Sequence, residues 1–250
     1  MQRRQFLQTS ALATALLGGM PLSATAKSAK GKVVVIGGGY GGATAAKYLR
    51  MLSGNQLDVT LVEPNSTFVS CPMSNLVVGG IRKINEISTP YTGLTRNHGV
   101  KMVKDYVTAI DVEKRTVKLK NGKTLPYDKL VLSPGIDLQL DKIEGLAAAN
   151  ASGQILQAWK AGPETVGLRK QLEAMPDGGT YILNVPLAPY RCPPGPYERA
   201  SMVANYFKQY KPKSKVLLLD ANADVTSKGK LFKGVWESEY KGILEYRPNM

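Results

Sequence analysis

Three glycines at fixed spacing carry the clearest chemical signal in the sequence. Gly37, Gly39 and Gly42 form a G-x-G-x-x-G pattern. Such glycines supply, in order, a tight turn, close approach of the backbone to a pyrophosphate, and close packing of the following helix on a strand. Glu63 follows about 20 residues later, where a carboxylate can bind both hydroxyls of an adenosine ribose. The pattern therefore predicts a dinucleotide site.

The residues around the glycines place them between a strand and a helix. Residues 32–36 form a continuous β-branched run, typical of a strand buried on both faces, and residues 43–52 have a helical pattern. A second apolar run, 58–62, leads into Glu63. We expect the phosphates at the positive end of the helix. A glycine-rich surface turn is the alternative, and the ordered strand, turn, helix, strand and acid argue against it.

The rest of the first half continues this pattern. Residues 64–75 are rich in loop formers and contain Cys71, which we expect to lie along the cofactor at the carboxyl ends of the strands. We predict strands at 101–105 and 107–111 and a hairpin around Asn121-Gly122. Residues 127–132 predict a buried strand that ends in a turn of small residues, 133–135. These segments define a first domain, 31–146.

The second half repeats the layout without the glycines. We predict helices at 164–175 and 198–210 and strands at 180–185 and 215–220, after a linker at 141–160 with poor periodicity. The loop at 186–198 is rich in proline, which has no N–H to donate, so a pyrophosphate cradle is lost although Asp220 occupies the position of the ribose acid. We therefore expect an α/β fold of two Rossmann-like domains, the second (160–250) incomplete and unable to bind NAD(P)H.

The N-terminus has the features of an export signal. A twin arginine, Arg3-Arg4, precedes a short apolar stretch and the small-residue site Ala24-Thr25-Ala26. We predict that residues 1–26 are a twin-arginine signal peptide and that the mature chain is periplasmic. A chance basic start before a short core helix is the alternative. Beyond this segment no apolar run reaches the roughly 18 residues that a spanning helix needs.

The net charge and the small numbers of cysteine and histidine argue against some classes of function. The net charge of the 250 residues is +14, and Arg3 and Arg4 leave with the signal. The lysines are scattered rather than clustered, which favours an acidic protein partner over nucleic acid. Two cysteines and one histidine, His98, argue against a metal site. We interpret His98 as a residue at a helix C-terminus, not a catalyst.

The first half resembles the two-dinucleotide-binding flavoproteins. The resemblance covers residues 31 to about 140 and includes the strand, Tyr127-Asp128 and the closing small-residue turn. It implies FAD rather than NAD in the first site. The residues that we expect to contact FAD are Gly37, Gly38, Gly39, Tyr40, Gly41, Gly42, Glu63, Pro64, Cys71, Val107, Ser133, Pro134 and Gly135.

Two further motifs carry a closer resemblance. Residues 70–75 (Ser-Cys-Pro-Met-Ser-Asn) and 189–200 (Pro-Tyr-Arg-Cys-Pro-Pro-Gly-Pro-Tyr-Glu-Arg-Ala) are similar to the flavoprotein subunit of flavocytochrome c sulfide dehydrogenase. The resemblance implies a thioether from Cys71 to the 8α-methyl of FAD. It also implies that Cys192 is half of a redox-active disulfide beside the flavin ring. Hydrosulfide is then the substrate and needs no histidine base, since it is already a nucleophile.

The resemblance also implies an electron acceptor outside this chain. The sequence has no Cys-x-x-Cys-His, so a haem must belong to a c-type cytochrome subunit or a soluble cytochrome c. In the family the disulfide partner of Cys192 lies in a C-terminal portion, and we expect the 250 residues to be an N-terminal piece of a longer polypeptide. Four alternatives stay open: a sulfide:quinone reductase, an NADH-dependent disulfide reductase, an inactive flavin-binding fragment, and a simple Cys71–Cys192 disulfide.

Overall fold

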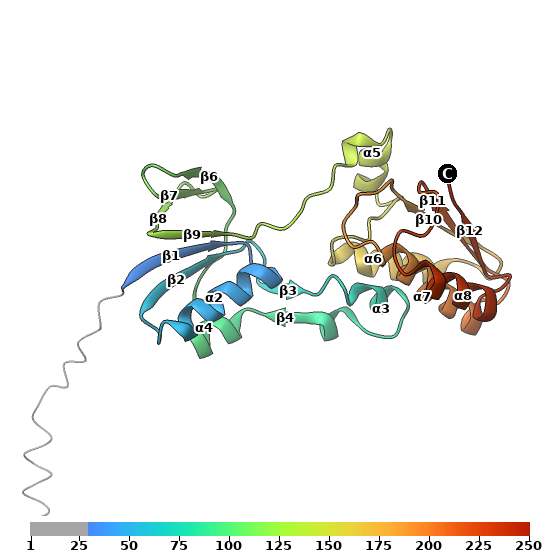
Figure 1. Ribbon diagram of the computed structural model, residues 1–250, viewed down its shortest axis with the longest axis horizontal. Coiled ribbons are helices and arrows are strands. Elements are labelled where there is room, and N and C mark those ends of the chain that lie inside the picture. Colours follow the sequence, from blue (N-terminus) through green and yellow to red (C-terminus); the bar gives the residue numbers. More distant parts are fainter. Residues whose placement is uncertain (1–29) are drawn as a thin grey trace, which may run out of the picture.

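The computed structural model describes residues 30–250 and arranges them in two sheet-containing parts (Figure 1). The predicted signal peptide lies outside the described residues. The strands are β1 Gly31–Ile36, β2 Leu57–Val62, β3 Thr67–Val69, β4 Ser88–Pro90, β5 Lys101–Val103, β6 Val107–Asp111, β7 Thr116–Leu119, β8 Thr124–Pro126, β9 Lys129–Leu132, β10 Thr180–Val185, β11 Lys215–Asp220 and β12 Leu244–Arg247. The α-helices are α2 Tyr40–Leu52, α3 Ser74–Val78, α4 Thr92–His98, α5 Leu146–Ala151, α6 Pro163–Ala174, α7 Gly195–Tyr210 and α8 Gly229–Glu239, and the 3-10 helices are η1 Ile84–Ile87 and η2 Leu140–Lys142.

The first part is built on a parallel sheet with strand order β5-β2-β1-β9. Its central strand, β1, is covered on both sides, and successive residues point to opposite faces. Val33 and Val35 pack in a cluster with Ala46 of α2. Val34 and Ile36 pack in a second cluster with residues of the antiparallel sheet β6-β7-β8. The continuous apolar run predicted this two-sided burial.

The second part is a parallel sheet of order β10-β11-β12. Helices α6, α7 and α8 cover one face of this sheet (Figure 1). Their apolar side chains, among them Phe207 and Trp236, form one core with Val216 and Leu218 of β11. The α/β class with two Rossmann-like units is thus confirmed. Helix α7 begins at Gly195, earlier than predicted, because Pro196 is compatible with the first turn of a helix.

Two crossings join the parts, and one of them carries a cysteine (Figure 1). The short strands β3 and β4 pair with each other and lead to α3, which packs on α6 and α7 of the second part. Val78 of α3 is buried in the core of the second part. Because Cys71 lies between β3 and α3, this packing carries it towards α7. The second crossing, 133–162, contains α5, which the sequence analysis missed because its six residues show no periodic apolar stripe.

Candidate functional site

The glycine motif forms a cradle at the carboxyl end of β1. Gly37 has φ +92°, and a Cβ at Gly37 would collide with the carbonyl oxygen of Ser133. A Cβ at Gly42 would collide with the carbonyl oxygen of Gly37. By contrast, the space within 4 Å of a Cβ at Gly39 holds no atom of the structure. Gly37 and Gly42 are therefore required by packing, whereas Gly39 leaves an open surface.

The open surface lies at the positive end of α2. Gly39 caps the helix, and no side chain bonds to the cap. The first N–H groups of a helix have no partner within the helix, so here they are available to an anion. An open, uncapped helix start beside glycine backbone fits the pyrophosphate of a dinucleotide.

Glu63 lies beside the cradle, and its carboxylate already accepts hydrogen bonds from the chain. Its Oε2 accepts a bond from the Gly38 N–H at 2.7 Å, and its Oε1 accepts bonds from the backbone and side-chain N–H groups of Asn65, both at 2.8 Å. A carboxylate has about four acceptor positions, so one position on Oε2 is left for a ribose hydroxyl. The sequence analysis missed Tyr91, whose hydroxyl donates to the Gly38 carbonyl at 2.8 Å. Burial, together with the negative charge of Glu63, raises the pKa of Tyr91 to about 12.

The other predicted FAD contacts fall into two groups. The turn at 133–135 lies against the cradle: the Ser133 N–H donates to the Ile36 carbonyl at 2.8 Å, and a Cβ at Gly41 would lie 3.3 Å from Ser133 Oγ. Pro64 is half-buried directly after Glu63. Val107, however, packs against the apolar cluster between the sheet and the hairpin, so the structure gives it a core contact.

Cys71 lies on the segment that leaves the cradle. The hydroxyls of Tyr40, at the start of α2, and of Ser70 are 2.6 Å apart, which ties this segment to the cradle. The half-buried Cys71 thiol donates to the Trp159 carbonyl at 2.8 Å. Burial raises the pKa of the Cys71 thiol, and the nearby Arg199 guanidinium is the main influence that lowers it.

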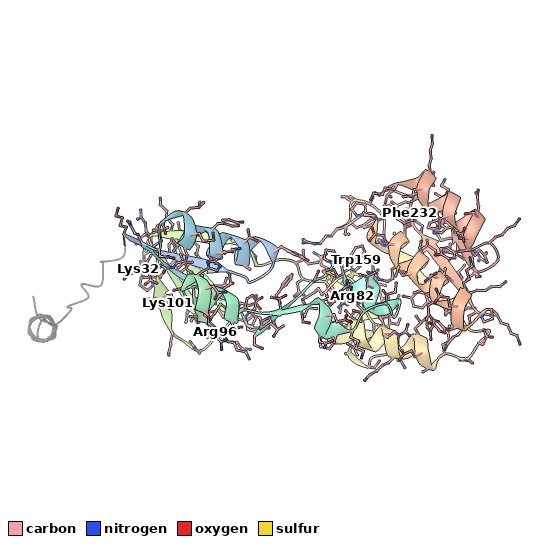
Figure 2. The ribbon with its side chains drawn as sticks, turned by 90° about the horizontal axis from the view of Figure 1, so that it is seen from below. Lys32, Arg82, Arg96, Lys101, Trp159 and Phe232 are labelled. Carbon is pink, nitrogen blue, oxygen red and sulfur yellow. The ribbon has the colours of Figure 1, made fainter. Side chains whose placement is uncertain are left out.

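Cys192, in the second part of the structure, lies near the same tryptophan. It is exposed, it has φ +57°, and its carbonyl accepts the Gly195 N–H at 2.9 Å where α7 begins. A Cβ at Gly195 would lie 3.2 Å from Cys192 Sγ and 3.8 Å from the Trp159 ring. Left-handed backbone in a non-glycine residue is uncommon and concentrates at functional sites. Figure 2 shows Trp159 in the region where the two parts of the chain meet.

The two cysteines are therefore brought to one place as free thiols. The simple disulfide that the cysteine count allowed is not present in the structure. Trp159 contributes its carbonyl to one cysteine and its ring to the surroundings of the other, although it lies in the stretch that sequence analysis treated as a linker. A tryptophan in a stretch without periodicity was the available signal for this contact.

In the second part, the acid at the position of the ribose carboxylate is occupied by hydrogen bonds from the chain itself. Asp220, at the position of the ribose acid, is fully buried. Its Oδ2 accepts from the hydroxyls of Tyr197 at 2.8 Å and Tyr246 at 3.2 Å, and its Oδ1 accepts from the backbone and side-chain N–H groups of Asn222. All four acceptor positions are satisfied by the chain itself. This arrangement supports the prediction that the second part does not bind NAD(P)H.

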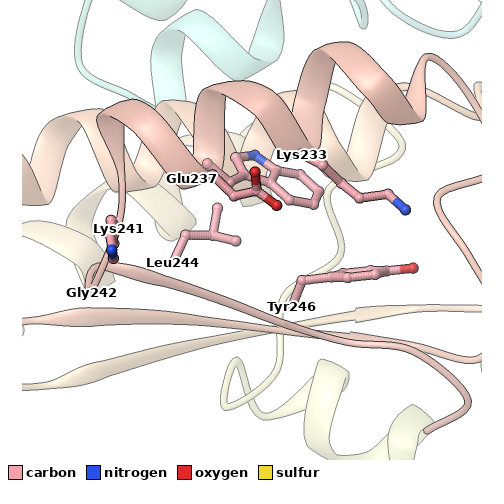
Figure 3. Close-up of a pocket in the computed structure, with 7 residues that line it drawn as sticks. Lys233, Glu237, Lys241, Gly242, Leu244 and Tyr246 are labelled. Carbon is pink, nitrogen blue, oxygen red and sulfur yellow. The ribbon is translucent and has the colours of Figure 1, made fainter.

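Among the cavities of residues 30–250, two lie outside the cysteine site. One, of about 340 Å³, lies beside the cradle between α2 and α4 and is lined by Phe68, Tyr91 and His98. His98 ends α4 before Gly99 at φ +61°, as predicted for a helix C-terminus. The other, of about 260 Å³, lies between α8 and β12, and Figure 3 shows Lys233 and Tyr246 at its wall. No predicted site residue lines this second cavity.

Comparison with known proteins gives two family matches. A family model described as "Pyridine nucleotide-disulphide oxidoreductase" matches residues 31–161. A second, described as "Sulfide dehydrogenase (flavocytochrome c) flavoprotein chain, central", matches residues 165–250. The two matches meet in the segment next to Trp159, where the two parts of the structure meet.

Individual relatives agree with these matches. The sulfide dehydrogenase (flavocytochrome c) flavoprotein chain of Chlorobaculum thiosulfatiphilum is 61% identical over 46 residues, which are 18% of this chain and 94% of that one. The mitochondrial sulfide:quinone oxidoreductase of Dictyostelium discoideum is 29% identical over 189 residues, covering 75% of this chain. This chain spans 41% of the length of that relative.

Solved structures show the same fold. The sulfide:quinone oxidoreductase of Aquifex aeolicus superposes with a TM-score of 0.73 at 23% identity, covering 87% of this chain and 51% of that one. Since the first family model covers more than half of the 250 residues, the chain belongs to the pyridine nucleotide-disulphide oxidoreductase family, and its residues 165–250 match the central region of flavocytochrome c sulfide dehydrogenase flavoproteins.

Proposed function

We propose that the chain is the flavoprotein of a sulfide dehydrogenase, which oxidises hydrosulfide through a cysteine and FAD and passes the electrons to a c-type cytochrome. One observation carries this proposal: two thiols from distant parts of the chain converge on Trp159, at the end of the segment that leaves the glycine cradle. The family supports an FAD-dependent oxidoreductase, and the relatives supply the class of substrate.

The residues of the first part fit FAD. Gly39 and the start of α2 would hold the pyrophosphate, Glu63 the ribose, and the 133–135 turn the far side of the cradle. When bound, FAD supplies a two-electron acceptor. Cys71, tied to the cradle through Ser70 and Tyr40, is our candidate for a covalent tether to the flavin.

Cys192 is our candidate for the reacting sulfur. It is exposed, so hydrosulfide can reach it, whereas Cys71 is half-buried. When Cys192 is bonded to a second sulfur, hydrosulfide attacks one sulfur, the S–S bond breaks, a new S–S bond forms, and the negative charge moves to the released sulfur. Because that step transfers no proton, it needs no histidine, and His98 ends α4 away from both thiols.

The electron acceptor separates two candidate functions. The match of residues 165–250 to a flavocytochrome c flavoprotein, and the basic charge of +14, favour a cytochrome with an acidic surface. The resemblance to sulfide:quinone oxidoreductases favours a quinone. In residues 30–250 no helix has the length and apolarity to cross a membrane. We propose the cytochrome, with the periplasm as its location on the evidence of the twin arginine.

An acceptor assay tests this proposal. The FAD-loaded chain is mixed anaerobically with sulfide and then with either oxidised cytochrome c or a soluble quinone. We expect sulfide to bleach the flavin and cytochrome c to restore its colour faster than quinone does. Faster recovery with quinone would assign the quinone function instead, and a flavin that does not respond to sulfide would leave a binding fragment. Addition of NADH provides a control, because the satisfied Asp220 predicts no bleaching by NADH.

A further inference from the structure

Arg199 is a buried cation with no acidic partner in the described residues. Its side chain is only 6% exposed, and none of the ion pairs within residues 30–250 includes it. One nitrogen, Nη2, donates to the Ala158 carbonyl at 2.7 Å, while Nε is buried with no hydrogen-bond partner. Burying a guanidinium charge is unfavourable unless a negative charge compensates it. The surroundings of Arg199 should therefore show where such a charge arises.

Those surroundings are the two sulfur atoms. Arg199 binds the carbonyl of Ala158, and the next carbonyl along the chain, that of Trp159, accepts the Cys71 thiol at 2.8 Å. A Cβ at Gly195, where the helix that carries Arg199 begins, would lie 3.2 Å from Cys192 Sγ and 3.8 Å from the Trp159 ring, so Cys192 is also near this tryptophan. The guanidinium and both thiols thus share one small region between α7, the start of α3 and the 158–159 segment.

The other ionisable groups near Arg199 do not supply the missing charge. They are Tyr181 on β10 and Glu198 on α7, in addition to the two cysteines, and Arg191 in the proline-rich loop adds a second positive charge near Cys71. Burial raises the pKa of Tyr181, which keeps it neutral at neutral pH. The Glu198 carboxylate faces Asn75, whose Nδ2 is 3.4 Å away, and makes no ion pair with Arg199. Among these side chains, only the sulfur atoms gain negative charge during thiol–disulfide exchange.

We propose that Arg199 is a positioning residue that stabilises negative charge on the sulfur of Cys192, and on that of Cys71 in the flavin-free chain. This inference rests on the proposed function, which places thiol–disulfide exchange at Cys192 and makes Cys71 the flavin tether, so that Cys71 is a thiol only in the flavin-free chain. In that exchange the negative charge of hydrosulfide passes to the released sulfur, with no proton and no further oxidant needed. A fixed, buried positive charge lowers the free energy of the charged sulfur without any movement of water.

The influences on the pKa of the Cys71 thiol give the direction of the effect expected when Arg199 is replaced. Burial raises the pKa of this thiol, and Arg199 is the strongest influence that opposes the rise. Without Arg199 the pKa rises further, so less thiolate is present at any pH below it. Because the thiolate is the reactive form of cysteine, its rate of alkylation reports this fraction directly.

The test is the pH profile of alkylation of each cysteine in the full chain. Iodoacetamide is added at a series of pH values, and the alkylated peptides of Cys71 and Cys192 are quantified by mass spectrometry. For Arg199→Met we expect the Cys71 profile to move to higher pH, with roughly tenfold slower alkylation at neutral pH. Arg199→Lys, which keeps the charge, should stay within about threefold of the wild type. If flavin occupies Cys71, the Cys192 peptide carries the test.

The matched control is Arg96→Met, which removes the same charge from an exposed arginine on α4, away from Trp159 (Figure 2). It should leave both profiles unchanged. If Arg199→Met behaves like Arg96→Met, or if Arg199→Lys shifts as much as Arg199→Met, the proposal is wrong. Failure of both Arg199→Met and Arg199→Gln to fold, judged by circular dichroism, would also contradict it by assigning Arg199 a structural role. Alkylation involves neither sulfide nor electron transfer, so it separates this inference from the proposed function.

Discussion

Replacing Gly39 with alanine should weaken flavin binding while leaving the fold intact. The backbone at Gly39 has φ −65° and ψ −170°, which any residue can adopt, and a Cβ there meets no atom within 4 Å. The added methyl group therefore points into the open surface of the cradle. That surface is where we place the pyrophosphate, so the substitution separates a structural glycine from a ligand-approach glycine.

Two opposing contributions to stability nearly cancel at this position. Alanine restricts the unfolded chain, which stabilises the fold by about 0.4–1 kcal/mol. Alanine is also a poorer N-cap than glycine, which costs on the order of 0.5–1 kcal/mol. We therefore expect the free energy of unfolding of Gly39→Ala, measured by urea titration, to lie within about 1 kcal/mol of the wild-type value.

The effect on flavin affinity should be much larger. A methyl group that pushes the pyrophosphate from the helix start removes at least one charge-assisted hydrogen bond, worth about 1.5–3 kcal/mol. That loss corresponds to roughly a tenfold to hundredfold increase in Kd. The assay is titration of the flavin-free chain with FAD, followed by the quenching of flavin fluorescence.

Two further glycine variants make the test specific. Gly234→Ala, at an exposed position of helix α8 with no atom within 4 Å of the new Cβ, should bind FAD normally. Gly42→Ala should lose both stability and FAD, because its Cβ collides with the Gly37 carbonyl. Unchanged FAD affinity in Gly39→Ala would refute the placement of the pyrophosphate. A large loss of stability in Gly39→Ala would refute the conclusion that the space next to Gly39 is open.

Three other outcomes follow from the geometry. Acid precipitation should leave flavin in the pellet of the wild type and release it from Cys71→Ala; flavin released from both would contradict the tether. Because the pKa of Tyr91 is raised to about 12, above its usual value near 10, its contribution to stability is complete below pH 10 and is lost as the pH rises through 12. Urea titrations between pH 10 and 12 should show a smaller loss of stability for Tyr91→Phe than for the wild type. The same pH dependence in both proteins would contradict the burial of this hydroxyl. Asp220→Ala should lower the free energy of unfolding by about 2–4 kcal/mol, because it leaves buried partners such as the Tyr197 hydroxyl without an acceptor; an unchanged urea midpoint would contradict that network.

The fold and the cradle were predictable because their signals are local. The β-branched run of β1 predicts a strand buried on both faces, and the glycine spacing after it predicts the turn and the helix. The sequence also predicts that the second part lacks a pyrophosphate cradle, since prolines stand in place of glycines at 186–198. The structure adds the reason why Asp220 is not available: tyrosine hydroxyls and Asn222 already bind it.

The cysteine site was only half predictable. The sequence places Cys71 and Cys192 in loops at the carboxyl ends of strands, but their convergence depends on how α3 packs on α6 and α7. The roles of Trp159 and Arg199 depend on contacts between residues far apart in sequence, such as the bond from Arg199 to Ala158. Periodicity and short motifs carry no information about such contacts.

The most direct test of the account is the reaction of sulfide with the FAD-loaded Cys192→Ser variant. Serine keeps the size and exposure of the side chain but cannot form a bond to a second sulfur. Anaerobic stopped-flow measurement follows the visible absorbance of the flavin after sulfide is added. We predict rapid bleaching in the wild type and none on the same timescale in Cys192→Ser, with the flavin content unchanged. Bleaching of the variant at the wild-type rate would show that electrons reach the flavin without Cys192 and would contradict the account.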